Sequence, residues 1–170
     1  MLELMVVVLI VGILAAIALP SFSVTIQSNR VAATTNELVA SLSLARSEAI
    51  RSNLGNGNQR ATSVCSSADR VTCGGVWNNG WIVFRDDDLD GSPGAGEILR
   101  FVEPAVGIDV ASANAQFDFD NRGRRLPPAD LTPPVGFVLR PVACVSGRPF
   151  QRTLTITATG QARFVRQNCP

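Results

Sequence analysis

The N-terminal segment constrains this chain more than any other part. From Leu4 to Leu19 every residue is apolar or glycine, and Glu3 carries the single charged side chain among the first nineteen residues. A helix that is apolar on every side must be buried in protein, in lipid or in a bundle of similar helices. At about 1.5 Å per residue the segment reaches only about 24 Å, shorter than a comfortable bilayer span of about 20 residues.

A cleaved secretory signal is the alternative for this segment. Ala16, Ile17 and Ala18 resemble a small-residue cleavage site at the end of an apolar core. Such a signal has a basic flank, whereas the flank here is Met-Leu-Glu. We therefore favour a retained single-pass anchor.

An amphipathic helix is predicted to continue the apolar segment. Apolar residues recur at three- and four-residue steps from Phe22 and Ile26 through to Leu38, Leu42, Ala45 and Ala49. The helix should end near Asn53, because the run from Leu54 is rich in Gly and Asn and Gly55 can form a left-handed cap. Pro20 should kink or loosen this helix of roughly 50 residues. Because so long a helix exceeds a globular core, its N-terminal half must project.

The rest of the chain is predicted to form a β-rich head. The alternation from Thr153 to Thr157 predicts a strand with one buried face. Segments 86–96 and 126–134 are rich in Asp, Gly and Pro and are predicted loops. The chain therefore divides into an apolar helix half (1–20), an amphipathic helix half (21–53) and a head (54–170), which is an α+β class. Strands are expected at 61–65, 80–84, 98–102, 115–119, 135–140, 152–157 and 162–165.

Composition argues against catalysis. All 15 basic residues are arginines, and the chain has no histidine. Histidine-activated serine or cysteine nucleophiles and an imidazole zinc ligand are therefore excluded. An exported hydrolase would also lack a nucleophile motif, so we expect neither enzyme activity nor a small-molecule substrate.

Charge is distributed unevenly although the net charge is only +1. Residues 86–120 hold nine acids and one arginine, whereas residues 121–170 hold eight arginines and one acid. Such polarity can orient partner subunits or bind an anion. The alternative is a solvated surface with scattered ion pairs.

Four cysteines allow three disulfide pairings. An export-type N-terminus without any C-x-x-C spacing favours disulfides over metal binding. We favour Cys65 with Cys73, which closes a short loop, and Cys144 with Cys169, which ties down the C-terminus. The other two pairings remain open at this point.

The run from Glu3 to Phe22 resembles the N-terminal helix of type IV pilins and pseudopilins. In that family the acidic residue pairs with the free N-terminal amine of a neighbouring subunit and sets the filament register. The resemblance implies this role for Glu3; the alternative is a glutamate that lies among lipid headgroups. It also implies N-terminal methylation and, since only Met-Leu precedes Glu3, a leader and about two mature residues ahead of the present start.

A second resemblance narrows the family. Leu44–Arg51, Gly80–Asp86 and Gly96–Arg100 are similar to the GspH/FimT group, the minor pseudopilins of type II secretion and minor pilins of type IV pili. This implies a long helix packed on an antiparallel β domain of two small sheets. It also implies a structural subunit of the bacterial inner membrane, with a periplasmic head, that joins other pilins in a pilus tip, an initiation complex or a pseudopilus.

One segment satisfies a calcium-loop pattern. Asp86, Asp88 and Asp90 alternate ahead of Gly91, and Glu97 closes the pattern. Carboxylates in this arrangement suit a hard cation. The alternative is a solvated hairpin loop without any cofactor, because a strand precedes the pattern where a calcium loop has a helix.

Basic residues could hold DNA. Minor pilins of the FimT type are linked with DNA capture through a C-terminal Gly-Arg-x-Arg element, which Gly160-Gln161-Ala162-Arg163 resembles with one arginine replaced. Arg166 follows it, and Arg122, Arg124 and Arg125 form another basic cluster. Phosphate contacts would give salt-sensitive, sequence-independent binding. The alternative partners are acidic loops of neighbouring subunits, while Trp77 and Trp81 are expected in the core.

Overall fold

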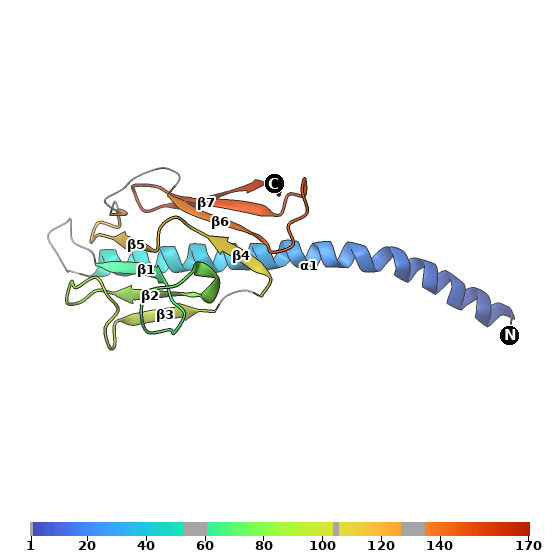
Figure 1. Ribbon diagram of the computed structural model, residues 1–170, viewed down its shortest axis with the longest axis horizontal. Helices are drawn as coiled ribbons and strands as arrows, with labels where there is room; N and C mark the ends of the chain where they lie inside the picture. The colour runs from blue at the N-terminus through green and yellow to red at the C-terminus, as the bar shows by residue number, and fades with distance from the viewer. Residues whose placement is uncertain (1, 53–60, 104–105, 127–134) are drawn as a thin grey trace.

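The computed structural model describes residues 2–52, 61–103, 106–126 and 135–170, with only the backbone described at residues 2 and 15–21. One long helix, α1 (Leu2–Arg51), lies beside a β-rich head (Figure 1). The head contains a short 3₁₀ helix, η1 (Trp77–Asn79). Its strands are β1 (Thr62–Ser66), β2 (Trp81–Arg85), β3 (Ile98–Val102), β4 (Ile108–Ala111), β5 (Gln116–Phe119), β6 (Gly136–Pro141), β7 (Gln151–Ile156) and β8 (Ala162–Gln167).

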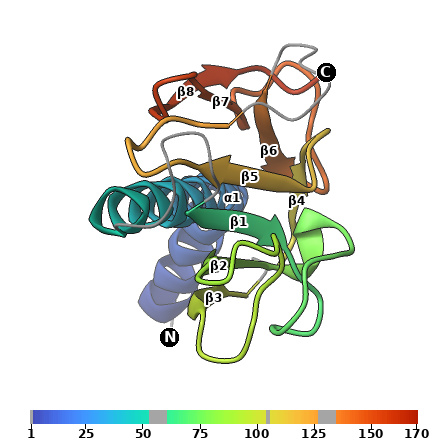
Figure 2. The same ribbon diagram turned by 90° about the vertical axis from the view of Figure 1, so that its left-hand side faces the viewer.

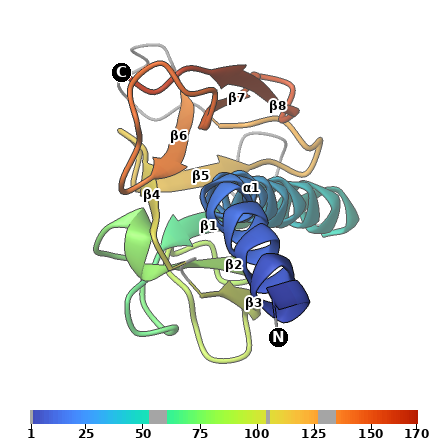
Figure 3. The ribbon, with the colours of Figure 1, turned by 90° about the vertical axis from the view of Figure 1, so that its right-hand side faces the viewer.

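Helix α1 has two halves with different surroundings. Its C-terminal half packs on the head, while its N-terminal half projects away and curves gently (Figures 1 and 3). The helix is continuous at Pro20, where the sequence predicts a kink, and it ends at Arg51 rather than Asn53. The predicted stop at Leu54 and Gly55 lies outside the described residues.

The buried face of α1 begins later than the apolar periodicity of its sequence. Leu38, Leu42, Ala45 and Ala49 are fully buried, as the periodicity indicates. Phe22 is 70% exposed and Ile26 is 43% exposed, however, so the first apolar residues of the amphipathic pattern are not covered by the head. The physical reason is that the head covers the helix only from about Val31 onward, the first buried position among the described side chains of α1.

Two antiparallel sheets flank the helix. One has the strand order β3-β2-β1-β5 and the other β4-β6-β7-β8. Viewed from the C-terminal end of α1, β3 and β8 lie at opposite sides of the head with the helix between them (Figure 2). The predicted architecture of a long helix on two small antiparallel sheets is confirmed.

All seven predicted strands are present, but two elements were missed. Strand β4 has only Ile108 and Val110 on its buried face, too short an alternation to be distinguished from a loop. The helix η1 is placed by Trp77, whose buried ring meets the Phe137 ring edge-on at 4.6 Å. Segment 86–96 forms a loop as predicted, and 127–134 lies outside the described residues.

The core lies between the helix and the sheets. Trp81 is fully buried, and its indole N–H donates to the Ser41 hydroxyl of α1 at 2.9 Å. The Trp77 indole N–H donates to the Asn114 carbonyl at 2.9 Å. Both tryptophans are therefore core residues, as predicted. Other buried side chains of the same cluster include Leu38, Leu42, Val64, Phe117, Phe119, Phe137, Leu139 and Leu154.

Candidate assembly and binding surfaces

The projecting half of α1 presents an apolar surface to solvent. Every described side chain from Glu3 to Leu14 is exposed, including Leu4 at 70% and Met5 at 76%. So large an apolar surface on a folded protein marks a site of interaction with protein or lipid. Within the part of the chain that the structure describes, no helix has a stretch long and apolar enough to cross a membrane.

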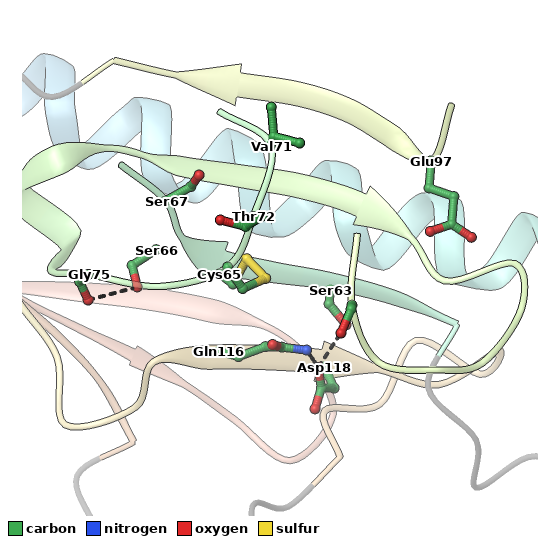
Figure 4. Close-up of a disulfide and its surroundings, with 12 residues drawn as sticks. Ser63, Cys65, Ser66, Ser67, Val71, Thr72, Gly75, Glu97, Gln116 and Asp118 are labelled. Atoms are coloured by element: carbon green, nitrogen blue, oxygen red, sulfur yellow. Dashed lines mark hydrogen bonds between the residues drawn. A yellow bond between two sulfur atoms is a disulfide. The ribbon is translucent and has the colours of Figure 1, made fainter. Parts of the chain in front are cut away.

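The Cys65–Cys73 disulfide ties β1 to the loop that follows it (Figure 4). The disulfide loop (67–75) is also held by Ser66 of β1, whose hydroxyl donates to the Gly75 carbonyl at 3.2 Å. Cys65 packs with Ile82 and Phe84 in a second, smaller core cluster. The disulfide loop therefore stabilises the face of the first sheet that points away from α1.

Asp69 organises the disulfide loop. Its carboxylate accepts hydrogen bonds from the Thr72 hydroxyl at 2.6 Å and from the N–H groups of Thr72 and Val71 at 2.8 and 2.9 Å. These donors, the Thr72 hydroxyl first, hold the pKa of Asp69 well below its usual value. Arg70 lies over the Phe101 ring at 5.0 Å and pairs with Glu103, which joins the loop to β3 and its end.

The second disulfide joins Cys144 to Cys169 and holds the chain end against the β6–β7 loop. Two backbone hydrogen bonds accompany it: Cys169 donates to Arg148 at 2.8 Å, and Gly147 donates to Cys169 at 3.1 Å. Both disulfides have the pairing that the sequence favoured, which is confirmed.

The predicted calcium residues lie in the loop between β2 and β3. Carboxylate oxygens of Asp86, Asp88 and Asp90 lie within 4.8 Å of one another. Asp86 is fully buried and accepts the Gly91 N–H at 3.1 Å. Glu97 is nearly buried, and its two oxygens accept the N–H groups of Asp87 and Gly94 at 2.8 and 2.6 Å. Asp86 and Glu97 thus serve as acceptors that close the loop itself.

Asp87 belongs to the same loop but pairs with an arginine. The Arg85 guanidinium donates to its carboxylate at 2.5 and 2.7 Å. This hydrogen bond, with the attraction between the charges, lowers the pKa of Asp87. Asp87 is therefore compensated within its own chain.

The structure brings two predicted basic segments together. The N–H of Arg125 donates to Ala158 at 3.1 Å, and the turn between β7 and β8 packs on the loop after β5. A Cβ added to Gly160 would lie 2.2 Å from the Gly123 carbonyl oxygen, so this approach requires glycine. The Arg122–Arg125 cluster thus lies beside the turn that leads to Arg163.

Two of these arginines are structural rather than free cations. Arg124 Nε donates to Asp120 at 2.8 Å, and the Asp120 side chain is fully buried. Arg125 is half-buried, and burial lowers its pKa. By contrast Arg122, Arg163 and Arg166 are exposed and form no ion pair with a described carboxylate.

A groove runs between the last turns of α1 and the β7–β8 turn. We call it the basic groove; it is lined by Ser43, Arg46, Ser47, Ile50, Gly160, Gln161, Ala162 and Arg163. Arg46 Nε donates to the Gly123 carbonyl at 3.1 Å, which joins the helix to the loop after β5. Arg46 was not identified from the sequence, because nothing near it in the chain marks this contact.

Arg166 lies on β8 opposite Arg152 of β7. Burial, and then the charge of Arg166, lower the pKa of Arg152. The Arg152 guanidinium lies over the Phe164 ring at 5.2 Å. Arg166 of the edge strand β8 therefore forms a cross-strand pair with Arg152 of β7, away from the loop that carries Arg122.

A long helix with an exposed apolar half, packed on two small disulfide-bonded antiparallel sheets, defines a pilin-like subunit. The family model described as type II transport protein GspH matches residues 34–160, and the chain belongs to this family. A search of curated proteins finds no significant sequence match.

Solved structures show the same fold. The chain is similar to the type IV minor pilin FimU of Pseudomonas aeruginosa in two crystal forms. The match to the P21 form has 19% identity and a TM-score of 0.55, and it covers 81% of this chain and 89% of FimU. The match to the P65 form has 21% identity and a TM-score of 0.51, and it covers 76% of this chain and 88% of FimU. At these identities the likeness is one of fold.

Proposed function

We propose that the chain is a low-copy structural subunit that helps initiate or tip a type IV pilus or a type II secretion pseudopilus. The observation that carries this proposal is an exposed apolar helix, from Leu4 to Leu14, attached to a head whose core is already complete. Such a surface requires a partner, and like helices from other pilins or pseudopilins supply one.

Before assembly the apolar half would be held in the inner membrane with the head in the periplasm. The four disulfide-bonded cysteines support an oxidising compartment for the head. The apolar stretch is short for a bilayer, and such mismatch is met by local thinning of the bilayer or by association with other helices.

Glu3 would set the subunit register. In the free chain it is exposed in the first turn of α1. Inside a bundle of apolar helices an unpaired carboxylate would be strongly unfavourable, so it needs a cation such as the N-terminal amine of a neighbour. Placement among lipid headgroups is the alternative.

A deletion strain tests the assembly role. We expect loss of surface filaments, or loss of secretion if the chain serves a pseudopilus, and restoration by the wild-type gene. Glu3→Ala should fail to restore assembly, whereas Glu103→Ala, which removes an exposed head carboxylate that pairs with Arg70, should restore it. Normal filaments and secretion in the deletion strain would reject the proposal.

DNA binding at the head is a second candidate function. Contact between the β7–β8 turn and the loop after β5 favours it, because that contact gathers Arg122 and Arg163 at one end of the head. Electrophoretic retardation of duplex DNA by the full chain at low salt should weaken when Arg122, Arg163 and Arg166 are changed to alanine. Arg148→Ala, an exposed arginine elsewhere, is the control. Unchanged retardation would eliminate this candidate.

A further inference from the structure

The tip of the β2–β3 loop carries an exposed apolar side chain between two acids. Leu89 is 40% exposed and has a φ of 64°, a conformation that bulky residues rarely adopt. Asp88 and Asp90 on either side are exposed and accept only N–H groups of their own loop, those of Asp90 at 3.2 Å and Ser92 at 2.6 Å. Neither acid pairs with an arginine in the described part of the chain.

The basic groove has the complementary composition. Ile50, which is 52% exposed, and Ala162 form its apolar part. Arg46 and Arg163 contribute positive charge, and neither has a carboxylate partner among the described residues. The groove therefore offers an apolar contact with a cation on each wall, and the loop tip offers a leucine with an anion on each side.

The two features lie at the same end of the head but on opposite sides of α1. The β2–β3 loop and the β7–β8 turn both reach the end where α1 finishes (Figure 1). Seen from that end, the sheet that carries β3 lies on one side of the helix and the sheet that carries β8 on the other (Figure 2). A loop tip therefore cannot enter the groove of its own chain, but a copy placed alongside with a parallel helix presents its tip at the same height.

We propose that the loop tip Asp88–Leu89–Asp90 of one copy seats in the basic groove of a second copy. Leu89 packs on Ile50 and Ala162, while the two acids face Arg46 and Arg163. Because different surfaces meet, the contact is heterologous: it places two neighbouring copies side by side and needs no twofold axis. Two copies related by a twofold axis with β8 against β8 would instead place arginines against arginines.

The contact is expected to be weak when heads meet in dilute solution. Exposed ion pairs contribute little, and the loop tip is small compared with a stable protein interface. Its role is to fix the orientation of heads that packing of the helices already holds close together, where the effective concentration is high. This inference rests on the proposed assembly function, but the contact itself involves only the heads.

Lysine chemistry offers a direct test, because the chain contains no lysine. Arg163→Lys keeps the positive charge and places the only side-chain amine in the basic groove. Equal amounts of ¹⁴N- and ¹⁵N-labelled full chain carrying this substitution are mixed in detergent micelles at low salt and treated with a carbodiimide. We expect an amide link between position 163 of one copy and Asp88 or Asp90 of the other, identified by mass spectrometry as a mixed-isotope peptide pair.

Two controls define the background. Arg148→Lys places the same amine on the β6–β7 loop and should not couple to the β2–β3 loop tip. Adding Asp88→Asn and Asp90→Asn to Arg163→Lys should reduce the cross-link to the level of the Arg148→Lys control. Unchanged tryptophan fluorescence and melting temperature would show that each variant is folded.

Coupling at position 163 no greater than that of the Arg148→Lys control would overturn the proposal. Coupling to head carboxylates other than those of the loop tip would overturn it too. If duplex DNA binds through Arg163 while no cross-link forms, the groove holds DNA and the self-contact is rejected. None of these outcomes bears on filament assembly through Glu3, so failure here is distinguishable from failure of the proposed function.

Discussion

Asp69 shows how a single carboxylate can hold a loop. Asp69→Asn should lower the melting temperature of the full chain at neutral pH, because the charged Asp69 carboxylate accepts three short hydrogen bonds that a neutral amide would accept more weakly. Its pKa is lowered by folding, so its stabilising contribution is complete above the unfolded pKa of about 4 and is lost as pH falls through the lower folded pKa.

Tryptophan fluorescence melts at a series of pH values would check this. The difference in melting temperature between wild type and Asp69→Asn should be constant from pH 7 to about pH 4 and then shrink. Asp88→Asn is the control, since its carboxylate accepts a single loop N–H. A difference that is unchanged at pH 2 would contradict the explanation.

Gly136 tests packing at a second single position. A Cβ at this residue of β6 would lie 1.8 Å from the Leu154 carbonyl oxygen of β7, so Gly136→Ala must separate paired strands. We expect a loss of about 3 kcal/mol in unfolding free energy, measured by urea denaturation. Gly12→Ala meets nothing within 4 Å and should leave the stability of the head unchanged. Equal effects of the two substitutions would refute this account.

Single residues differ in how far the sequence could predict them. The disulfides could be predicted, because loop length and compartment favour one pairing of four cysteines. Arg46 could not, because its partner carbonyl is 77 residues away and is brought close only by packing of the head. Arg124 and Arg125 were predicted as DNA-binding candidates. Only the structure shows that Arg124 pairs with Asp120 and that Arg125 is partly buried.

At the scale of elements, alternation predicted strands well where it was long. Strand β7 buries Leu154 and Ile156 and faces Thr155 outward, as its pattern indicates. The short β4 was missed because it is a strand through its pairing with β6, which its own four residues do not reveal. The N-terminal limit of the buried face of α1 could not be predicted from the periodicity either, because it depends on how far the head extends along the helix.

The C-terminal strand depends on a covalent tie. Changing both Cys144 and Cys169 to alanine should lower the unfolding free energy by about 3.5 kcal/mol, the chain-entropy value for a loop of about 25 residues. Hydrogen exchange should then accelerate in β8 while β1 and β2 stay protected. Changing Cys65 and Cys73 to alanine instead should accelerate hydrogen exchange in the disulfide loop. If exchange accelerates in the same segments for both variants, the effect of each disulfide is not local and this prediction is wrong.

The β2–β3 loop should fold without calcium. Both oxygens of Glu97 accept loop N–H groups, Asp86 accepts the Gly91 N–H, and Arg85 engages Asp87, so among the described acids of the loop Asp88 and Asp90 are the least engaged. Two exposed carboxylates fall short of the six to eight oxygens that calcium prefers. Isothermal titration of the full chain with millimolar calcium should give no binding heat. Stoichiometric heat that disappears in Asp88→Asn would restore the calcium hypothesis.

At the scale of the whole molecule, the head and the projecting helix half should be energetically independent. Described side chains from Glu3 to Leu14 are exposed, and the core begins at Val31. Removing residues 1–20 should therefore leave the melting temperature of the head within error of the full chain in detergent. It should also abolish the need for detergent. A truncated head that unfolds would show that the two parts share a core.

The continuity of α1 has a mechanical consequence. A helix of 50 residues measures about 75 Å along its axis, and α1 is continuous from Leu2 to Arg51. It therefore acts as a lever: a tilt of about 5° at the tip would move the C-terminal end of the helix, and the head packed on it, by about 6.5 Å. Small changes of tilt where the N-terminal ends of the helices pack together therefore produce larger displacements of the heads at the filament surface.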